Sequence, residues 1–272
     1  MAISRGFGVL AFDSYVHASA DCAEAYSVLD RYVWPSLPRV HWVERPPDLV
    51  IRIEKFEQQF RLLVNDVALG NSDDPVGLVP TIIQVIDETI LARLTTLRAV
   101  HAGAVLWGGR ALLLPGGTHA GKSSLVVEFL RRGAEYFSDE YALIDAEGRV
   151  HPYPRPLMVR NGSLEQRPTL ASDYNAVVSA GPARVGWIFS LKYVGGDDLT
   201  VAEVPQSVAL LDLLRNTPHV LADSPEIVDG FQRAVEGAAC YAGIRGDVFH
   251  AAERMTAMIG GADGPSCIEV VR

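Results

Sequence analysis

The segment with the clearest chemical signature begins at Gly116. In order, it reads Gly116, Gly117, Thr118, His119, Ala120, Gly121, Lys122 and Ser123, which fits the pattern G-x-x-x-x-G-K-S/T without a gap. A loop of this composition can turn successive backbone N–H groups inward around phosphate oxygens. The pattern predicts an ATP site over Gly116–Ser124, in which Lys122 bridges the β- and γ-phosphates and the Ser123 hydroxyl binds Mg²⁺. The alternative is a glycine-rich turn from a strand to a helix that holds no ligand.

The residues on either side of this segment favour the phosphate-binding interpretation. An apolar strand over residues 111–114 leads into it, and an amphipathic helix over 122–132 leads out, followed by Gly133 in the usual position of a helix-ending glycine. The N-terminus of that helix adds partial positive charge. His119 stands where many such loops have a third glycine. Because a positive φ angle suits histidine less well than glycine, His119 is either strained or neutral filler, or its imidazole reaches a phosphate or a substrate.

Two adjacent carboxylates, Asp139 and Glu140, follow the helix at the end of a short predicted strand. One carboxylate can polarise an attacking hydroxyl while the other holds Mg²⁺, directly or through water. The alternative is an exposed acidic turn. His101 starts another predicted strand, and on its own it is better explained as a structural histidine.

Several runs in this region resemble the catalytic domain of HPr kinase/phosphorylase. They are His101-Ala-Gly-Ala-Val, Leu114-Pro-Gly-Gly-Thr-His-Ala-Gly-Lys-Ser, Leu130-Arg-Arg-Gly and Ser138-Asp-Glu. The chain is similar in particular to the HPr-kinase-related proteins found beside peptide-modification clusters, including lasso-peptide serine kinases. The strong similarity covers about residues 99–145. Weaker similarity continues through 152–156 and through the strand at Cys240 with the last helix, whereas residues 1–95 differ from the N-terminal domain of HPr kinase.

The resemblance implies an α/β fold with a phosphate loop of the HPr kinase and phosphoenolpyruvate carboxykinase type. It implies transfer of phosphate from ATP, with Mg²⁺, to a serine of a protein or peptide. In that family the position of His101 lies near the transferred phosphate, that of Asp139 accepts the proton of the attacking hydroxyl, and that of Glu140 is associated with the metal. Glu140 replaces a second Asp of the family and has a longer arm, so which carboxylate does which task stays open.

Other basic and polar residues are weaker candidates. Arg155 and Arg160 bracket an extended segment where relatives carry a basic residue, so they could neutralise transition-state charge, dock the substrate or simply be solvated. Asn161, Lys192 and Arg245 are weaker candidates than these two arginines. HPr kinases are hexamers, which makes a homo-oligomer possible here. Two other functions stay open: an ATP-binding adaptor or sensor without catalysis, which His119 favours, and a kinase of a small metabolite.

Composition limits the partners. The chain has 272 residues, of which 49% are hydrophobic, and a net charge of −9. Nucleic-acid binders more often carry a basic face, so no nucleic-acid partner is expected. It has three widely spaced cysteines and no metal-ligand spacing among its histidines, which predicts neither disulfides nor a zinc site. The sequence has no leader pattern and no run long enough for a membrane helix, so the expected location is the cytoplasm. Only three residues are lysines, and Lys122 is one of them.

The periodicity predicts two parts, an α+β region over 1–95 and an α/β nucleotide-binding domain over 96–272. In the first part, strands at 49–54 and 59–64 form a hairpin, 70–76 is a loop in which Asp74 can cap the next helix, and 79–97 is a long amphipathic helix. The hairpin and helix either hold a peptide by strand addition or cover an edge of the catalytic sheet. The other expected strands are 6–12, 99–107, 110–114, 135–137, 141–144, 185–193, 199–204 and 239–244, and the other expected helices are 21–32, 122–132, 207–214, 225–237 and 248–259.

Overall fold

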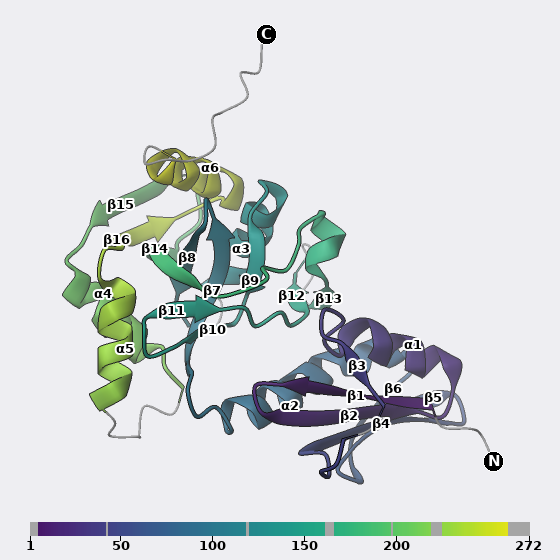
Figure 1. The fold of residues 1–272 in the computed structure, drawn as a ribbon. Helices are drawn as coiled ribbons and strands as arrows, with labels where there is room; N and C mark the ends of the chain where they lie inside the picture. The colour runs from purple at the N-terminus through teal and green to yellow at the C-terminus, as the bar shows by residue number, and fades with distance from the viewer. Residues whose placement is uncertain are drawn as a thin grey trace. The chain divides into compact units, whose positions relative to one another are not determined.

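The computed structural model describes residues 5–41, 43–117, 120–160, 166–196, 198–218 and 225–260. The chain forms two compact units, of which unit 1 comprises Met1–Thr95 with Pro154–Leu170 and unit 2 comprises Thr96–Tyr153 with Ala171–Arg272 (Figure 1). The chain therefore leaves unit 1 after Thr95 and returns to it for one short segment. The division expected from the sequence misses this return, because a proline-rich extended segment carries no local signal for the unit it packs against.

Unit 1 is built on a six-stranded sheet in the order β3-β1-β2-β4-β5-β6. The strands are β1 (Arg5–Ala11), β2 (Ser14–Ala20), β3 (Arg39–Val40), β4 (Leu49–Phe56), β5 (Gln59–Val64) and β6 (Val67–Ser72). The predicted hairpin of β4 and β5 is confirmed. Residues 70–72, predicted as loop, continue β6, and its side chains are mostly exposed, so this edge strand shows no hydrophobic alternation in the sequence. Strand β2 was also not predicted, because its run Ser-Tyr-Val-His-Ala-Ser-Ala is rich in alanine and serine.

Three helical segments and a small hairpin complete unit 1. They are α1 (Ala23–Tyr32), η1 (Pro75–Leu78), α2 (Val79–Leu91), and the pair β12 (Leu157–Val159) and β13 (Arg167–Thr169). Asp74 caps η1 as predicted, accepting a hydrogen bond from the Val76 amide at 2.9 Å. Helix α2 ends at Leu91, six residues earlier than predicted. The returning segment joins the core of unit 1, where Met158 packs against Val28, Val79 and Ile83.

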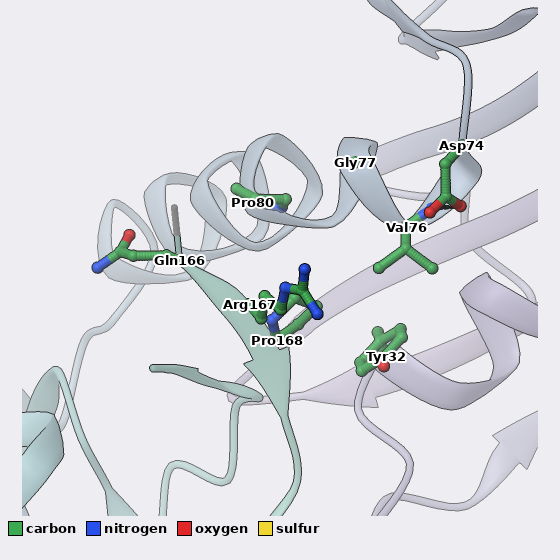
Figure 2. A pocket seen from close by; sticks show the side chains of 8 residues that line it. All are labelled: Tyr32, Asp74, Val76, Gly77, Pro80, Gln166, Arg167 and Pro168. Carbon is green, nitrogen blue, oxygen red and sulfur yellow. Dashed lines mark hydrogen bonds between the residues drawn. The ribbon is translucent and has the colours of Figure 1, made fainter. Parts of the chain in front are cut away.

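A cavity of about 740 Å³ opens within unit 1. Tyr32 at the end of α1 and Val76 of η1 point toward each other on one side, with Arg167 and Pro168 of β13 across from them (Figure 2). The remaining lining residues are Asp74, Gly77, Pro80 and Gln166. None of the eight is a site residue predicted from the sequence.

Unit 2 has an eight-stranded sheet in the order β11-β10-β7-β8-β14-β16-β15, with β9 also paired to β7. The strands are β7 (Arg98–Trp107), β8 (Arg110–Pro115), β9 (Glu135–Ser138), β10 (Tyr141–Ile144), β11 (Arg149–His151), β14 (Ala183–Tyr193), β15 (Leu199–Glu203) and β16 (Ala239–Arg245). The helical segments are α3 (Lys122–Arg131), η2 (Ala171–Tyr174), α4 (Gln206–Arg215), α5 (Pro225–Val235) and α6 (Val248–Ile259). Both units together make the protein mixed α/β. Within the described ranges, no helix is long and apolar enough to cross a bilayer.

The helices of unit 2 cover both faces of its sheet (Figure 1). Ala102 and Ala104 of β7 belong to a buried cluster that includes Leu213 of α4 and Phe231 of α5. Gly103, between them, faces Val126 of α3, whose Cγ2 would lie 2.8 Å from a β-carbon at this position. Because successive residues of a strand point to opposite faces, α3 lies on the face away from α4 and α5. Glycine at 103 thus allows the helix that follows the predicted phosphate loop to pack closely on the sheet.

Candidate functional site

The site is positioned by three neighbouring parallel strands. Strand β14 runs parallel to both β8 and β16, so the carboxyl ends of all three meet at one edge of the sheet. The Gly116–Ser123 segment follows β8, and Gly246 with Asp247 follows β16. Open α/β sheets bind ligands at this edge, because the connections that leave it can surround a ligand.

The Gly116–Ser123 segment connects β8 directly to α3. The Gly116 amide donates to the His101 carbonyl of β7 at 3.2 Å, which anchors the start of the segment. Gly121 has φ 75° and ψ 25°, a left-handed conformation that favours glycine, and it is the N-cap of α3. Thr118 and His119 lie outside the described residues, so the predicted roles of both stay open. The strand, loop and helix around them are those expected from the sequence.

Lys122 is the first residue of α3 and is 7% exposed. The Lys122 Nζ donates to the Gly117 carbonyl at 3.0 Å. This hydrogen bond joins the end of the Gly116–Ser123 segment to its beginning. Ser123 is half-buried and Ser124 is exposed in the same first turn. Among the described residues no side chain caps α3, whose first-turn amides carry the helix's partial positive charge.

Strand β7 lies between the acidic pair and the Gly116–Ser123 segment, and it pairs with the strands that carry both. The register pairs Tyr141 with His101 and Ser138 with Ala104, which places Asp139 opposite Gly103 and Glu140 opposite Ala102. On its other side β7 pairs Ala102 with Pro115, the last residue before Gly116. The start of the glycine-rich segment, residues 101–103 of β7 and the acidic turn therefore lie at the same level of the sheet, with β7 in the middle.

The structure brings His101 and Glu140 into direct contact. A ring nitrogen of His101 forms a hydrogen bond with a Glu140 carboxylate oxygen, and the imidazole also packs on the Tyr141 ring with centroids 5.5 Å apart. The His101 amide donates to the Asn216 carbonyl at 2.7 Å. The position of this histidine is thus fixed by backbone and side chain together.

Asp139 is 1% exposed, whereas the Glu140 side chain is 29% exposed. The Tyr136 hydroxyl donates to the Asp139 carboxylate at 3.2 Å. The Ser138 hydroxyl accepts hydrogen bonds from the amides of Glu140 and Tyr141, which holds the turn in shape. The alternative of an exposed acidic turn is therefore wrong for Asp139. Sequence reasoning missed Tyr136 and gave no role to Ser138, although Ser138 stands in one of the runs that carry the resemblance; the only signal for either role was closeness to the acidic pair.

The weaker candidates separate into two groups. Arg155 belongs to unit 1, where it is buried and forms an ion pair with Asp87 of α2 at 3.3 Å, so the alternative of a solvated arginine is wrong. Arg160 is an exposed residue of the same unit, and Asn161 is not among the described residues. In unit 2, Lys192 is exposed near the end of β14 and Arg245 is buried at the end of β16. Of these five, Arg245 contacts the Gly116–Ser123 segment, by hydrogen bonds to two of its carbonyls.

The part of the chain that the structure describes has no group of three or more His, Cys, Asp or Glu side chains that could hold a metal ion. Comparison with protein-family models finds no match, and comparison with curated protein sequences finds none either. The function is therefore inferred from the residues and from the geometry that they adopt.

Proposed function

We propose that this protein transfers the γ-phosphoryl group of ATP to a serine hydroxyl of a protein or peptide. The observation that carries the proposal is one juxtaposition. A segment with the phosphate-loop pattern ends in a left-handed glycine and a buried lysine at a helix start. A carboxylate pair lies at the same level of the sheet, on the other side of β7.

The phosphate tail of ATP would be held by amides of the Gly116–Ser123 segment, by the N-terminus of α3 and by the Lys122 ammonium. The amides of Gly116 and Ala120 do not take part, because they donate to the carbonyls of His101 and Gly117. Burial strengthens the attraction of that ammonium for phosphate, because less water screens it than at the surface. The helix N-terminus contributes about 0.3–2 kcal/mol to the binding of an anion, depending on how buried the anion is. The remaining affinity comes from the amide cradle and from Lys122.

The residues beside the segment also suit Mg²⁺. This ion prefers oxygen ligands, keeps several waters, and commonly uses one or two protein ligands together with the substrate phosphates. The Ser123 hydroxyl and the Glu140 carboxylate supply such oxygens, so a cluster of three carboxylates is not required. When bound, Mg²⁺ would offset the charge that develops on the phosphate oxygens.

In the proposed reaction the serine oxygen forms a bond to the γ-phosphorus as the bond from that phosphorus to the β–γ bridging oxygen breaks, leaving ADP. The proton of the serine hydroxyl passes to the Asp139 carboxylate. Tyr136, hydrogen-bonded to Asp139, fixes the direction of that carboxylate. Glu140 fixes the His101 ring, which would lie near the transferred phosphate as the family resemblance implies.

The proposal is tested with radiolabelled ATP, Mg²⁺ and serine-containing acceptor peptides. We expect Lys122→Ala and Asp139→Asn to lower transfer by about 10²–10³-fold or more while the far-UV circular dichroism stays unchanged, because preorganised charge dominates catalysis in such sites. Lys55→Ala, which removes the exposed lysine of β4 in unit 1, is the control for loss of a lysine and should retain transfer. Wild-type turnover in Lys122→Ala or Asp139→Asn would overturn the mechanism.

One observation favours the alternative of an ATP-binding adaptor or sensor. Asp139 is almost completely buried, and a general base must reach the proton that it accepts. The same assay separates the two functions: ATP binding by calorimetry without transfer to any acceptor identifies the adaptor, and label on a small metabolite but on no peptide identifies a metabolite kinase.

A further inference from the structure

Arg245 is a buried cation next to the predicted phosphate loop. It ends β16, pairs with Tyr193 of β14 and Leu199 of β15, and is 3% exposed. Among the described residues no carboxylate lies within ion-pair distance of its guanidinium, and its Nε has no hydrogen-bond partner. A buried charge is costly unless it is compensated, so its contacts indicate what it is for.

The contacts of the guanidinium are carbonyl groups and one ring. Its Nη2 donates to the carbonyls of Gly121 at 3.0 Å and Ala120 at 3.4 Å, and its Nη1 donates to the Gly246 carbonyl at 2.9 Å. The Tyr193 ring centroid lies 5.1 Å from the guanidinium carbon. Two of the three carbonyls therefore belong to the last turn of the Gly116–Ser123 segment. Burial lowers the pKa of Arg245, and the nearby Tyr193 and Asp247 partly offset this.

The direction of those carbonyls determines the direction of the amides. In a trans peptide the C=O and N–H groups of one unit point to opposite sides. A carbonyl of Ala120 held toward Arg245 turns the Gly121 amide away from it. The Gly121 carbonyl is held by Arg245 and also by the Leu125 amide of α3 at 3.3 Å, and its direction turns the Lys122 amide to the opposite side. Those are two of the amides that would face a phosphate.

We propose that Arg245 is a positioning residue. It binds the carbonyl side of the end of the phosphate loop and so keeps the amides on the opposite side in an anion-binding arrangement. This inference rests on the proposed function, in which ATP supplies the phosphate that the loop binds. Glycine at 121 serves the same arrangement, since a β-carbon there would overlap Nη2 of Arg245. Arg245 also adds positive potential to a loop on an acidic chain.

The test compares Arg245→Met and Arg245→Lys with Arg254→Met, which makes the same change at an exposed position on α6. Hydrogen exchange of residues 116–125 is measured without nucleotide, and calorimetry measures the Kd for Mg²⁺-ATP and for pyrophosphate. We expect Arg245→Met to speed exchange in 116–125 and to raise the Kd by about 10–100-fold, as the loss of hydrogen bonds to a charged group would. Arg245→Lys, which keeps the charge but not the forked donors, should fall between wild type and Arg245→Met.

Arg254→Met should match wild type in both measurements, and exchange in α4 and α5 should not change in any folded variant. Wild-type exchange and Kd in Arg245→Met would overturn the inference. If Arg245→Met does not fold, Arg245→Lys decides: wild-type values overturn the inference, and faster loop exchange supports it. A wild-type protein that binds neither ATP nor pyrophosphate would overturn the proposed function, whereas the exchange measurement would still test what Arg245 does to the loop.

Discussion

Replacing Gly121 by alanine should destabilise unit 2 for two separable reasons. The first is the backbone, because φ is 75° and a left-handed conformation costs an alanine about 1–2 kcal/mol. The second is the side chain, because the new β-carbon would displace the Arg245 guanidinium from the Ala120 and Gly121 carbonyls. Hydrogen bonds to a charged group are worth about 1.5–3 kcal/mol. Together the two effects predict a loss of about 2.5–5 kcal/mol.

Gly133 provides the matched control for the backbone effect. It has φ 96° just after α3, and a β-carbon there would meet nothing within 4 Å. Gly133→Ala should therefore cost about 1–2 kcal/mol, the backbone effect alone. In an Arg245→Met background, the free-energy cost of Gly121→Ala should also fall to about this value, because no guanidinium is left for the new β-carbon to displace.

The assay is a double-mutant cycle of Gly121→Ala and Arg245→Met measured by denaturant titration. Because the chain forms two compact units, a single titration curve does not by itself report on unit 2. The stability of unit 2 is therefore read from the exchange of β8 and β14 amides at each denaturant concentration. We expect a coupling free energy of about 1.5–3 kcal/mol between the two positions. Additive effects, or equal costs for Gly121→Ala and Gly133→Ala, would refute the contact between loop and arginine as an energetic link.

Three further predictions concern groups outside the predicted loop. Burial raises the pKa of Asp145, but hydrogen bonds from His151 and from Arg149 outweigh it and leave the pKa below the ordinary value. Asp145→Asn should thus cost about 1–3 kcal/mol at pH 7, and the difference from wild type, followed by thermal unfolding, should vanish as the pH falls from about 4 through the folded pKa. Asp87→Ala should destabilise unit 1 by about 3–5 kcal/mol in denaturant titrations, because it leaves the buried Arg155 charge without that partner. Burial raises the pKa of the Cys240 thiol, so alkylation followed by mass spectrometry should find it unreactive at pH 7 until unit 2 unfolds.

The elements around the predicted loop could be read from the sequence because each carries a strong local signal. Gly108 and Gly109 both have positive φ, as a tight turn between β7 and β8 requires. Gly133, also at positive φ, follows α3 at the expected place. Strong apolar runs on either side of these glycines define the strands and the helix. Where a segment is exposed or poor in β-branched residues, as in β6 and β2, the local pattern did not predict a strand.

The contacts between distant segments could not be predicted from the sequence. Nothing local indicates that Glu140 meets His101, because that contact depends on the antiparallel pairing of β10 with β7. The return of 154–170 to unit 1, and with it the pairing of Arg155 with Asp87, is equally non-local. Arg245 carries no local signal for its role, because its closeness to the loop depends on β14 lying between β8 and β16.

Two cations hold carbonyl groups of the Gly116–Ser123 segment, one near each end. Lys122 donates a hydrogen bond to the carbonyl of Gly117, and Arg245 donates to those of Ala120 and Gly121. A loop whose carbonyls are drawn toward the protein's own cations presents its amides elsewhere, and amides with a helix N-terminus attract anions. The net charge of −9 therefore does not oppose an ATP site, because positive potential at short range outweighs distant, screened charge. It follows that raising the salt concentration should weaken ATP binding much less than it weakens a binding site made of exposed lysines and arginines.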